Sequence, residues 1–180
     1  MKNIERNLVL IGMRGTGKTA IGKTLAEFLK FQFVDIDTEI EKNENAKIAE
    51  IVAKKDWEYF RSLEATETKK FAATKNCVIS TGGGVVLRPR NIENLKKNGI
   101  VIFIHAPLPH LARRVAKNTN RPSLTGASPT DELAKIWADR EKFYRAAADV
   151  EVFFDFETKN KKTDLLRKSK LILQAVKKFR

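Results

Sequence analysis

Short apolar runs alternate along the chain with longer segments in which apolar residues recur at helical spacing. The apolar runs span residues 8–11, 31–35, 77–80, 100–105 and 150–154. Runs of this length, bounded by turn-forming residues, are typical of buried strands in a parallel sheet. The segments between them are long enough for crossing helices. The pattern therefore predicts an α/β fold in which one doubly wound, five-stranded parallel sheet is flanked by helices.

Helices are expected in the segments that separate or follow these strands. Their expected ranges are residues 20–30, 38–54, 57–74, 89–98, 107–115, 130–148 and 163–179. The second helix should break near residues 43–45. Asp56 should cap the third helix, and Pro89 and Gly99 should begin and end the fourth.

One long polar segment, residues 117–129, interrupts this pattern. A loop of this length in a compact domain is usually functional and is often a lid. We therefore expect a single domain over residues 1–180, with a lid at about residues 112–128.

The first apolar run leads directly into the motif Gly-Met-Arg-Gly-Thr-Gly-Lys-Thr at residues 12–19. This motif fits the pattern Gly, any four residues, Gly-Lys-Ser/Thr of loops that cradle phosphate groups. Lys18 adds a positive charge for the β and γ phosphates, and the Thr19 hydroxyl is suited to bind Mg²⁺. An ordinary glycine-rich turn is the alternative. The strand before the motif and the helix after it favour a nucleoside triphosphate site.

Carboxylates and glycines follow two other predicted strands, where ligands gather in doubly wound folds. The second strand ends in Asp35-Ile36-Asp37. Alternate residues of an extended segment point the same way, so both carboxylates can face the cleft. One could support Mg²⁺ through its waters, and the other could accept a proton from a substrate hydroxyl. A turn in which Asp37 merely caps the next helix is the alternative.

The third strand ends in Ser-Thr-Gly-Gly-Gly at residues 80–84. Consecutive glycines let the backbone approach a ligand and expose N–H donors, although a plain loop is the alternative. Arginines at positions 61, 121, 140 and 145 could pair with carboxylate or phosphate groups. His105 and His110 are interpreted as structural, because no cysteine or acidic cluster accompanies them.

The chain carries 35 Lys and Arg against 22 Asp and Glu, a net charge of +13. Such a surplus is compatible with nucleic acid, but the basic residues are scattered and no aromatic-interleaved platform accompanies them. The apolar runs are too short to span a membrane, and residues 1–6 lack a secretory core. Cys77 is the single cysteine. We therefore expect a cytoplasmic protein that binds small molecules, with monomer as the default because no heptad seam is present.

Together these motifs resemble those of the shikimate kinase family, which has a nucleoside monophosphate kinase-like fold. The family pattern is a phosphate loop, Asp-x-Asp, Phe-Arg, Gly-Gly-Gly, a lid Arg-Pro and a further Arg. Here these motifs stand at residues 12–19, 35–37, 60–61, 82–84, 121–122 and 140. The resemblance covers about residues 8–154. It implies ATP-dependent phosphorylation of the 3-hydroxyl of shikimate, a ring carboxylic acid with three hydroxyls, giving shikimate 3-phosphate and ADP.

The resemblance also implies roles on the acceptor side. Arg61 and Arg140 would grip the shikimate carboxylate. Asp37 would bind the reacting hydroxyl and is the candidate base. The three glycines Gly82, Gly83 and Gly84 would form the substrate-binding turn, with Gly83 touching shikimate through its backbone.

On the nucleotide side, the resemblance implies a Mg²⁺ site at Thr19 and Asp35. Arg121 would close over the ATP phosphates, and both Lys18 and Arg121 would be catalytic. Arg114 would pack on adenine. The implied ATP-binding residues are Gly15, Thr16, Gly17, Lys18, Thr19, Ala20, Arg114 and Arg121.

The sequence departs from the family pattern at several positions around the site. Asn45 replaces a glycine, and Asn tolerates positive φ better than most residues. Asp56 and Trp57 replace a Gly-Glu pair, and Lys142 replaces a proline. Two alternatives remain open: a P-loop kinase for another acceptor, such as gluconate or a nucleoside monophosphate, and a nucleotide-switched nucleic-acid-binding protein. The Asn-Lys-Lys-Thr-Asp run at residues 160–164 resembles the guanine motif of GTPases, but its spacing is off by one.

Overall fold

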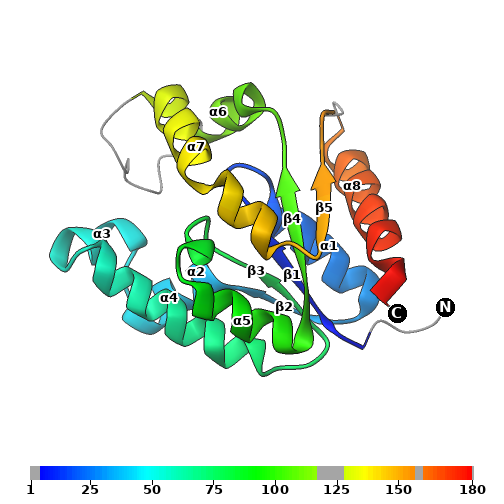
Figure 1. Ribbon diagram of the computed structural model, residues 1–180, viewed down its shortest axis with the longest axis horizontal. Helices are drawn as coiled ribbons and strands as arrows, with labels where there is room; N and C mark the ends of the chain where they lie inside the picture. Colours follow the sequence, from blue (N-terminus) through cyan, green and yellow to red (C-terminus); the bar gives the residue numbers. More distant parts are fainter. Residues whose placement is uncertain (1–4, 117–127, 157–159, 180) are drawn as a thin grey trace.

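The computed structural model describes residues 5–116, 128–156 and 160–179, and five strands lie at its centre (Figure 1). The strands are β1 (Asn7–Ile11), β2 (Gln32–Asp35), β3 (Cys77–Ser80), β4 (Gly99–His105) and β5 (Val150–Phe153). All neighbouring strands are parallel, and their order across the sheet is β2-β3-β1-β4-β5. The predicted α/β class and five-stranded parallel sheet are therefore confirmed.

Helices connect the strands and cover both faces of the sheet. In the described residues the α-helices are α1 (Lys18–Leu29), α2 (Ile36–Glu44), α3 (Ile48–Lys54), α4 (Trp57–Ala72), α5 (Pro89–Asn98), α6 (Leu108–Ala116), α7 (Pro129–Ala147) and α8 (Lys161–Ala175). Short 3₁₀ helices, η1 (Val85–Leu87) and η2 (Val176–Phe179), follow β3 and α8.

The alternation of side chains along each strand divides the core into two layers. On β1, Leu8 and Leu10 belong to a cluster that includes residues of α1 and α8. Val9 and Ile11 belong to a second cluster on the opposite face, together with residues of α2 to α7. Both faces of the central strand are buried, which explains its uninterrupted apolar run. Figure 1 shows α1 and α8 on one side of the sheet and α4, α5 and α7 on the other.

Local signals for helix ends are largely confirmed. Asp56 caps α4, because its Oδ1 accepts a hydrogen bond from the Tyr59 amide at 2.7 Å. Pro89 is the first residue of α5. Asn45 ends α2 with a left-handed φ of 48°, which is the conformation that its side chain tolerates. The predicted break between α2 and α3 therefore follows from one asparagine.

The start of α2 corrects the predicted geometry of the Asp-x-Asp segment. The helix begins at Ile36, earlier than the expected start at residue 38, so Asp37 lies in its first turn. The residue that caps α2 is Asp35, whose Oδ1 accepts from the Thr38 amide at 3.3 Å. The two carboxylates therefore do not alternate along an extended strand. They reach the same edge of the sheet because the strand passes directly into a helix.

The predicted lid at about residues 112–128 lies mostly outside the described residues, which omit 117–127. Residues 112–116 form the end of α6, and the Ser128 hydroxyl accepts from the Asp131 amide and so caps α7. Among the described helices, none has the length and apolarity needed to cross a bilayer.

Candidate active site

The phosphate loop joins β1 to α1 through backbone conformations that require glycine. Gly12, Gly15 and Gly17 have φ values of 139°, 84° and 91°. A Cβ at Gly12 would also lie 2.2 Å from the Ile104 carbonyl oxygen of β4. Gly17 immediately precedes α1, so the loop ends at the positive end of that helix.

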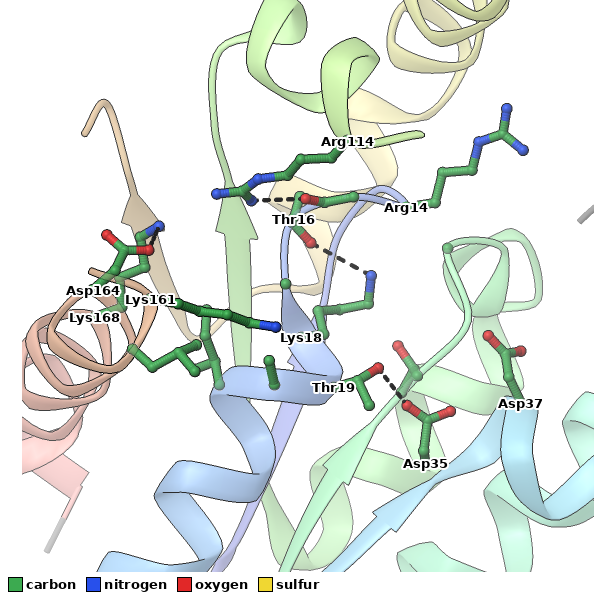
Figure 2. A pocket seen from close by; sticks show the side chains of 17 residues that line it. Arg14, Thr16, Lys18, Thr19, Asp35, Asp37, Arg114, Lys161, Asp164 and Lys168 are labelled. Carbon is green, nitrogen blue, oxygen red and sulfur yellow. Dashed lines mark hydrogen bonds and ion pairs between the residues drawn. The ribbon is translucent and has the colours of Figure 1, made fainter. Parts of the chain in front are cut away.

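Two cations are fixed to carbonyl groups of this loop. Lys18 is buried, and its Nζ donates to the carbonyls of Gly12 at 2.8 Å and Met13 at 2.9 Å. Arg114, from α6, donates from Nη1 to the Gly15 carbonyl at 2.8 Å. Figure 2 shows both side chains beside the loop. The loop therefore holds one buried ammonium group and, beside Gly15, a guanidinium group from α6.

A cleft of about 590 Å³ opens beside the phosphate loop. Asp35, Asp37, Thr81 and Gly83 line one end of the cleft, and residues of α8 line the other. A neighbouring hollow of about 410 Å³ shares Asp37 and other residues with the cleft and extends to α3. The cleft therefore extends on both sides of the phosphate loop, toward β2 and β3 on one side and toward α8 on the other.

Thr19 and Asp35 form an oxygen-rich corner of the cleft. The Thr19 hydroxyl donates to Asp35 Oδ2 at 2.7 Å, as the dashed line in Figure 2 marks. Mg²⁺ prefers oxygen ligands and commonly binds through one or two protein groups, several waters and substrate phosphates. This pair, next to the phosphate loop, fits such a site. Within the described residues, no group of three or more His, Cys, Asp or Glu side chains forms a separate metal site.

The triple glycine at residues 82–84 brings the acceptor-side residues together. A Cβ at Gly82 would lie 2.8 Å from Asp37 Oδ1 and 2.6 Å from Glu64 Oε1. A Cβ at Gly84 would lie 2.2 Å from the Arg61 guanidinium carbon. The glycines therefore make room for two carboxylates, one from α2 and one from α4, and for a guanidinium group from α4.

Arg61 is held on several sides. Its Nη1 pairs with Glu64 Oε2 at 2.6 Å, and the Glu64 side chain is fully buried. Its guanidinium carbon lies 5.5 Å from the Trp57 ring centroid and 5.1 Å from that of Phe60. Cation–π contacts and a buried ion pair thus fix the guanidinium against the glycines.

Arg140 and Tyr144 reach the same turn from α7. Arg140 Nη1 donates to the Gly83 carbonyl at 3.1 Å, and Tyr144 Oη donates to it at 2.5 Å. Burial raises the pKa of Tyr144 to about 12, although the Arg140 charge acts in the opposite direction. The phenol is therefore protonated at neutral pH and serves as a hydrogen-bond donor.

Three residues of this site are not among the sequence predictions, namely Glu64, Tyr144 and Glu132, whose carboxylate contacts Arg14 of the phosphate loop. Helical spacing is the signal that points to them. Glu64 lies one helical turn after Arg61, Tyr144 one turn after Arg140, and Glu132 two turns before Arg140. Arg121 lies outside the described residues.

The side chains of Arg145 and His105 make their contacts outside the cleft. Arg145 pairs with Glu141 and with Glu151 of β5. His105 lies 2.9 Å from Glu151 and stacks on Phe103, and burial lowers its pKa although the Glu151 charge opposes this shift. Neither side chain lines the cleft.

A strand–loop–helix phosphate cradle on a sheet of this order places the chain among the P-loop kinases. The family model for shikimate kinase matches residues 14–172. The chain belongs to the shikimate kinase family.

Similarity to individual relatives extends over most of the chain. The shikimate kinase of Caldanaerobacter subterraneus is 44% identical over 142 residues, which cover 79% of this chain and 83% of the relative. That of Persephonella marina is 42% identical over 147 residues, which cover 82% and 88%. The structure of shikimate kinase from Acinetobacter baumannii in complex with shikimate has a TM-score of 0.86 at 32% identity, covering 95% of this chain and 92% of that one.

Proposed function

We propose that the protein transfers the γ-phosphoryl group of ATP to the 3-hydroxyl of shikimate, giving shikimate 3-phosphate and ADP. The triple glycine supports this most strongly, because its residues contact Asp37, Arg140 and Arg61 in turn. A proton acceptor and two cations for a carboxylate thus converge beside the phosphate loop. A relative whose structure holds shikimate supports the same acceptor.

On the nucleotide side, Lys18 and the loop N–H groups bind the phosphates and neutralise charge on the transferred group. Arg114 packs on adenine from its position on α6. Thr19 and Asp35 would hold Mg²⁺, which would supply further charge neutralisation on the phosphates. Arg121 completes this set by closing over the phosphates.

On the acceptor side, Arg61 and Arg140 bind the shikimate carboxylate and so orient the ring. The Gly83 backbone contacts the ring, and Gly82 and Gly84 leave room for the side chains on either side of it. Asp37 accepts the proton of the 3-hydroxyl. The hydroxyl oxygen forms a bond to the γ-phosphorus while the bond from that phosphorus to the bridging oxygen of ADP breaks.

The lid at about residues 112–128 belongs to this proposal. Its closure excludes water, which would otherwise compete with the acceptor hydroxyl for the phosphoryl group. We also place the enzyme in the cytoplasm as a monomer, without a nucleic-acid or membrane partner. The free thiol of buried Cys77 is compatible with a reducing compartment. Light scattering on the purified protein would test whether it is a monomer.

The proposed reaction is tested by ADP release from Mg-ATP with a panel of acceptors. The panel contains shikimate, gluconate, the common nucleoside monophosphates, and a sample with no acceptor. We expect rapid release with shikimate alone. Release with another acceptor instead would keep the kinase class and reject shikimate. Intact ATP binding without acceptor-dependent release would reject the small-molecule kinase.

A further inference from the structure

The helix α7 contacts both halves of the cleft. Glu132 lies about two turns before Arg140, and Tyr144 lies about one turn after it. Arg140 and Tyr144 donate to the Gly83 carbonyl at the acceptor side. Glu132, in the first turn, contacts Arg14 of the phosphate loop. The helix therefore bridges the nucleotide loop and the triple glycine.

The contact between Arg14 and Glu132 is short and its carboxylate is buried. Arg14 Nη2 lies 2.5 Å from Glu132 Oε1, and the two side chains are 21% and 1% exposed. Figure 2 shows that the Arg14 side chain leaves the loop in a direction away from Lys18. A carboxylate buried to this degree is costly unless a cation is close, so the pair resists separation.

The backbone of Arg14 also lies next to the acceptor turn. A Cβ on Gly83 would be 3.5 Å from the Arg14 amide nitrogen. A shift of the phosphate loop would therefore move Arg14 relative to both Gly83 and α7. Because packed elements transmit small displacements, the loop and Arg140 are mechanically linked through these contacts.

We propose that Arg14 and Glu132 form a positioning pair, which ties the phosphate loop to α7 and thereby sets Arg140 relative to the nucleotide. This inference rests on the proposed function, in which Arg140 grips the acceptor carboxylate. A nucleotide that orders the loop then favours the α7 position that binds the acceptor. By linkage, each ligand raises the affinity for the other, and the pair carries part of this coupling.

The test measures the dissociation constant of shikimate by calorimetry, with and without saturating Mg-ADP. The ratio of the two constants is the coupling factor. We expect a factor of about 5–150 in the wild type, the usual range for linked sites. Glu132→Gln keeps the size of the side chain but removes its charge, and it should lower the factor below that of the wild type.

Glu141→Gln is the matched control for this variant. It removes the same charge from the same helix, but Glu141 pairs with Arg145 and does not line the cleft. Its coupling factor should equal that of the wild type. Circular dichroism and melting curves establish that both variants are folded at the temperature of the titration. If Glu132→Gln does not fold, Arg14→Lys tests the same contact, because it keeps the charge and loses the guanidinium fork.

Two outcomes would overturn the inference. The first is a coupling factor of one in the wild type. The second is a factor in folded Glu132→Gln that equals the factor in Glu141→Gln. If Mg-ADP also binds more tightly to Glu132→Gln in this second case, Arg14 has a direct role toward phosphate instead.

ADP release from the same wild-type preparation distinguishes failure of the positioning pair from failure of the proposed function. A wild type that releases ADP with shikimate, but whose coupling does not depend on Glu132, rejects the positioning pair alone. A wild type without shikimate-dependent release rejects the proposed function, and the inference with it.

Discussion

The nucleotide half and the acceptor half of the cleft are built in opposite ways. The nucleotide half comes chiefly from one contiguous stretch, residues 12–19, whose backbone forms the cradle. The acceptor half is assembled from α2, α4 and α7, whose side chains meet at residues 82–84. One half is therefore encoded locally, whereas the other depends on the packing of the whole domain.

Glycine has a different purpose in each half. In the described residues, the glycines with positive φ are Gly12, Gly15 and Gly17 of the phosphate loop. Gly82 and Gly84 have no such φ, but a Cβ on either would collide with a functional side chain. Glycine thus supplies conformation in the first half, with space as well at Gly12, and it supplies space alone at Gly82 and Gly84 of the second. Substitutions in the two halves should consequently fail for different reasons.

The largest expected effect comes from Asp37→Asn, which removes the proposed base from the acceptor half. The kcat with shikimate should fall by about 10²–10⁴-fold, the usual contribution of general base catalysis. Mg-ADP affinity should not change, because the cradle is formed by other residues. Steady-state kinetics and calorimetry on the same preparation measure both values. Near-normal turnover would remove Asp37 from its role.

A smaller effect is expected from Gly84→Ala, which places a methyl group against the Arg61 guanidinium. Displacing that group by about 1 Å should lower kcat/KM for shikimate by about 10²-fold. Gly83→Ala is the matched comparison, because its Cβ would meet neighbouring atoms at 3.5 Å, an ordinary contact distance. It should cost less than Gly84→Ala. The reverse order would show that space is not what these glycines provide.

In the nucleotide half, Gly15→Ala should act through backbone strain. A left-handed φ costs a non-glycine residue about 1–2 kcal/mol, so Mg-ADP affinity should fall by about 10-fold. Affinity for shikimate alone should fall less. If the variant loses both affinities equally, the two halves are not separable in the way that their construction indicates.

The smallest expected effect concerns Tyr144, which joins α7 to the acceptor turn. Its pKa is raised to about 12 from 10.0, so the folded state holds the phenolic proton more tightly than the unfolded state. This contribution to stability is complete below pH 10.0 and is lost as the pH rises toward about 12. Melting temperatures across this range should fall more steeply in the wild type than in Tyr144→Phe.

The stability of Tyr144→Phe at neutral pH is a second measurement of the contribution of this side chain. Loss of one hydrogen bond should cost about 1 kcal/mol in denaturant unfolding. The cost is limited because Arg140 still donates to the Gly83 carbonyl. Equal pH dependence in the two proteins would contradict the raised pKa of Tyr144.

The difference between the halves also decides what the sequence alone could predict. The phosphate loop, its strand and its helix follow from a local pattern, as does the left-handed turn at Asn45. The position of Asp37 was expected at the right edge of the sheet but on the wrong element, because the strand gives way to α2 at Ile36. A short apolar run does not indicate the residue at which the strand ends and the next helix begins.

Long-range contacts account for the rest. Helical spacing pairs Glu64 with Arg61 and Tyr144 with Arg140, but no local pattern shows that Tyr144 and Arg140 share the Gly83 carbonyl. Arg145 was a candidate by residue type, but it lies about 140° around α7 from Arg140 and pairs with Glu141 instead. The choice between these arginines depends on which face of α7 meets the sheet.

The central claim is that Arg140 binds a carboxylate while it is held against Gly83. The most direct measurement compares the dissociation constants of shikimate and its methyl ester in the wild type and in Arg140→Met. A hydrogen bond to a charged group is worth about 1.5–3 kcal/mol, so the wild type should prefer shikimate by about 10-fold or more. Arg140→Met should lose part of this preference, because Arg61 still faces the carboxylate. An unchanged preference in the variant would show that the carboxylate binds elsewhere, and it would contradict this account of the site.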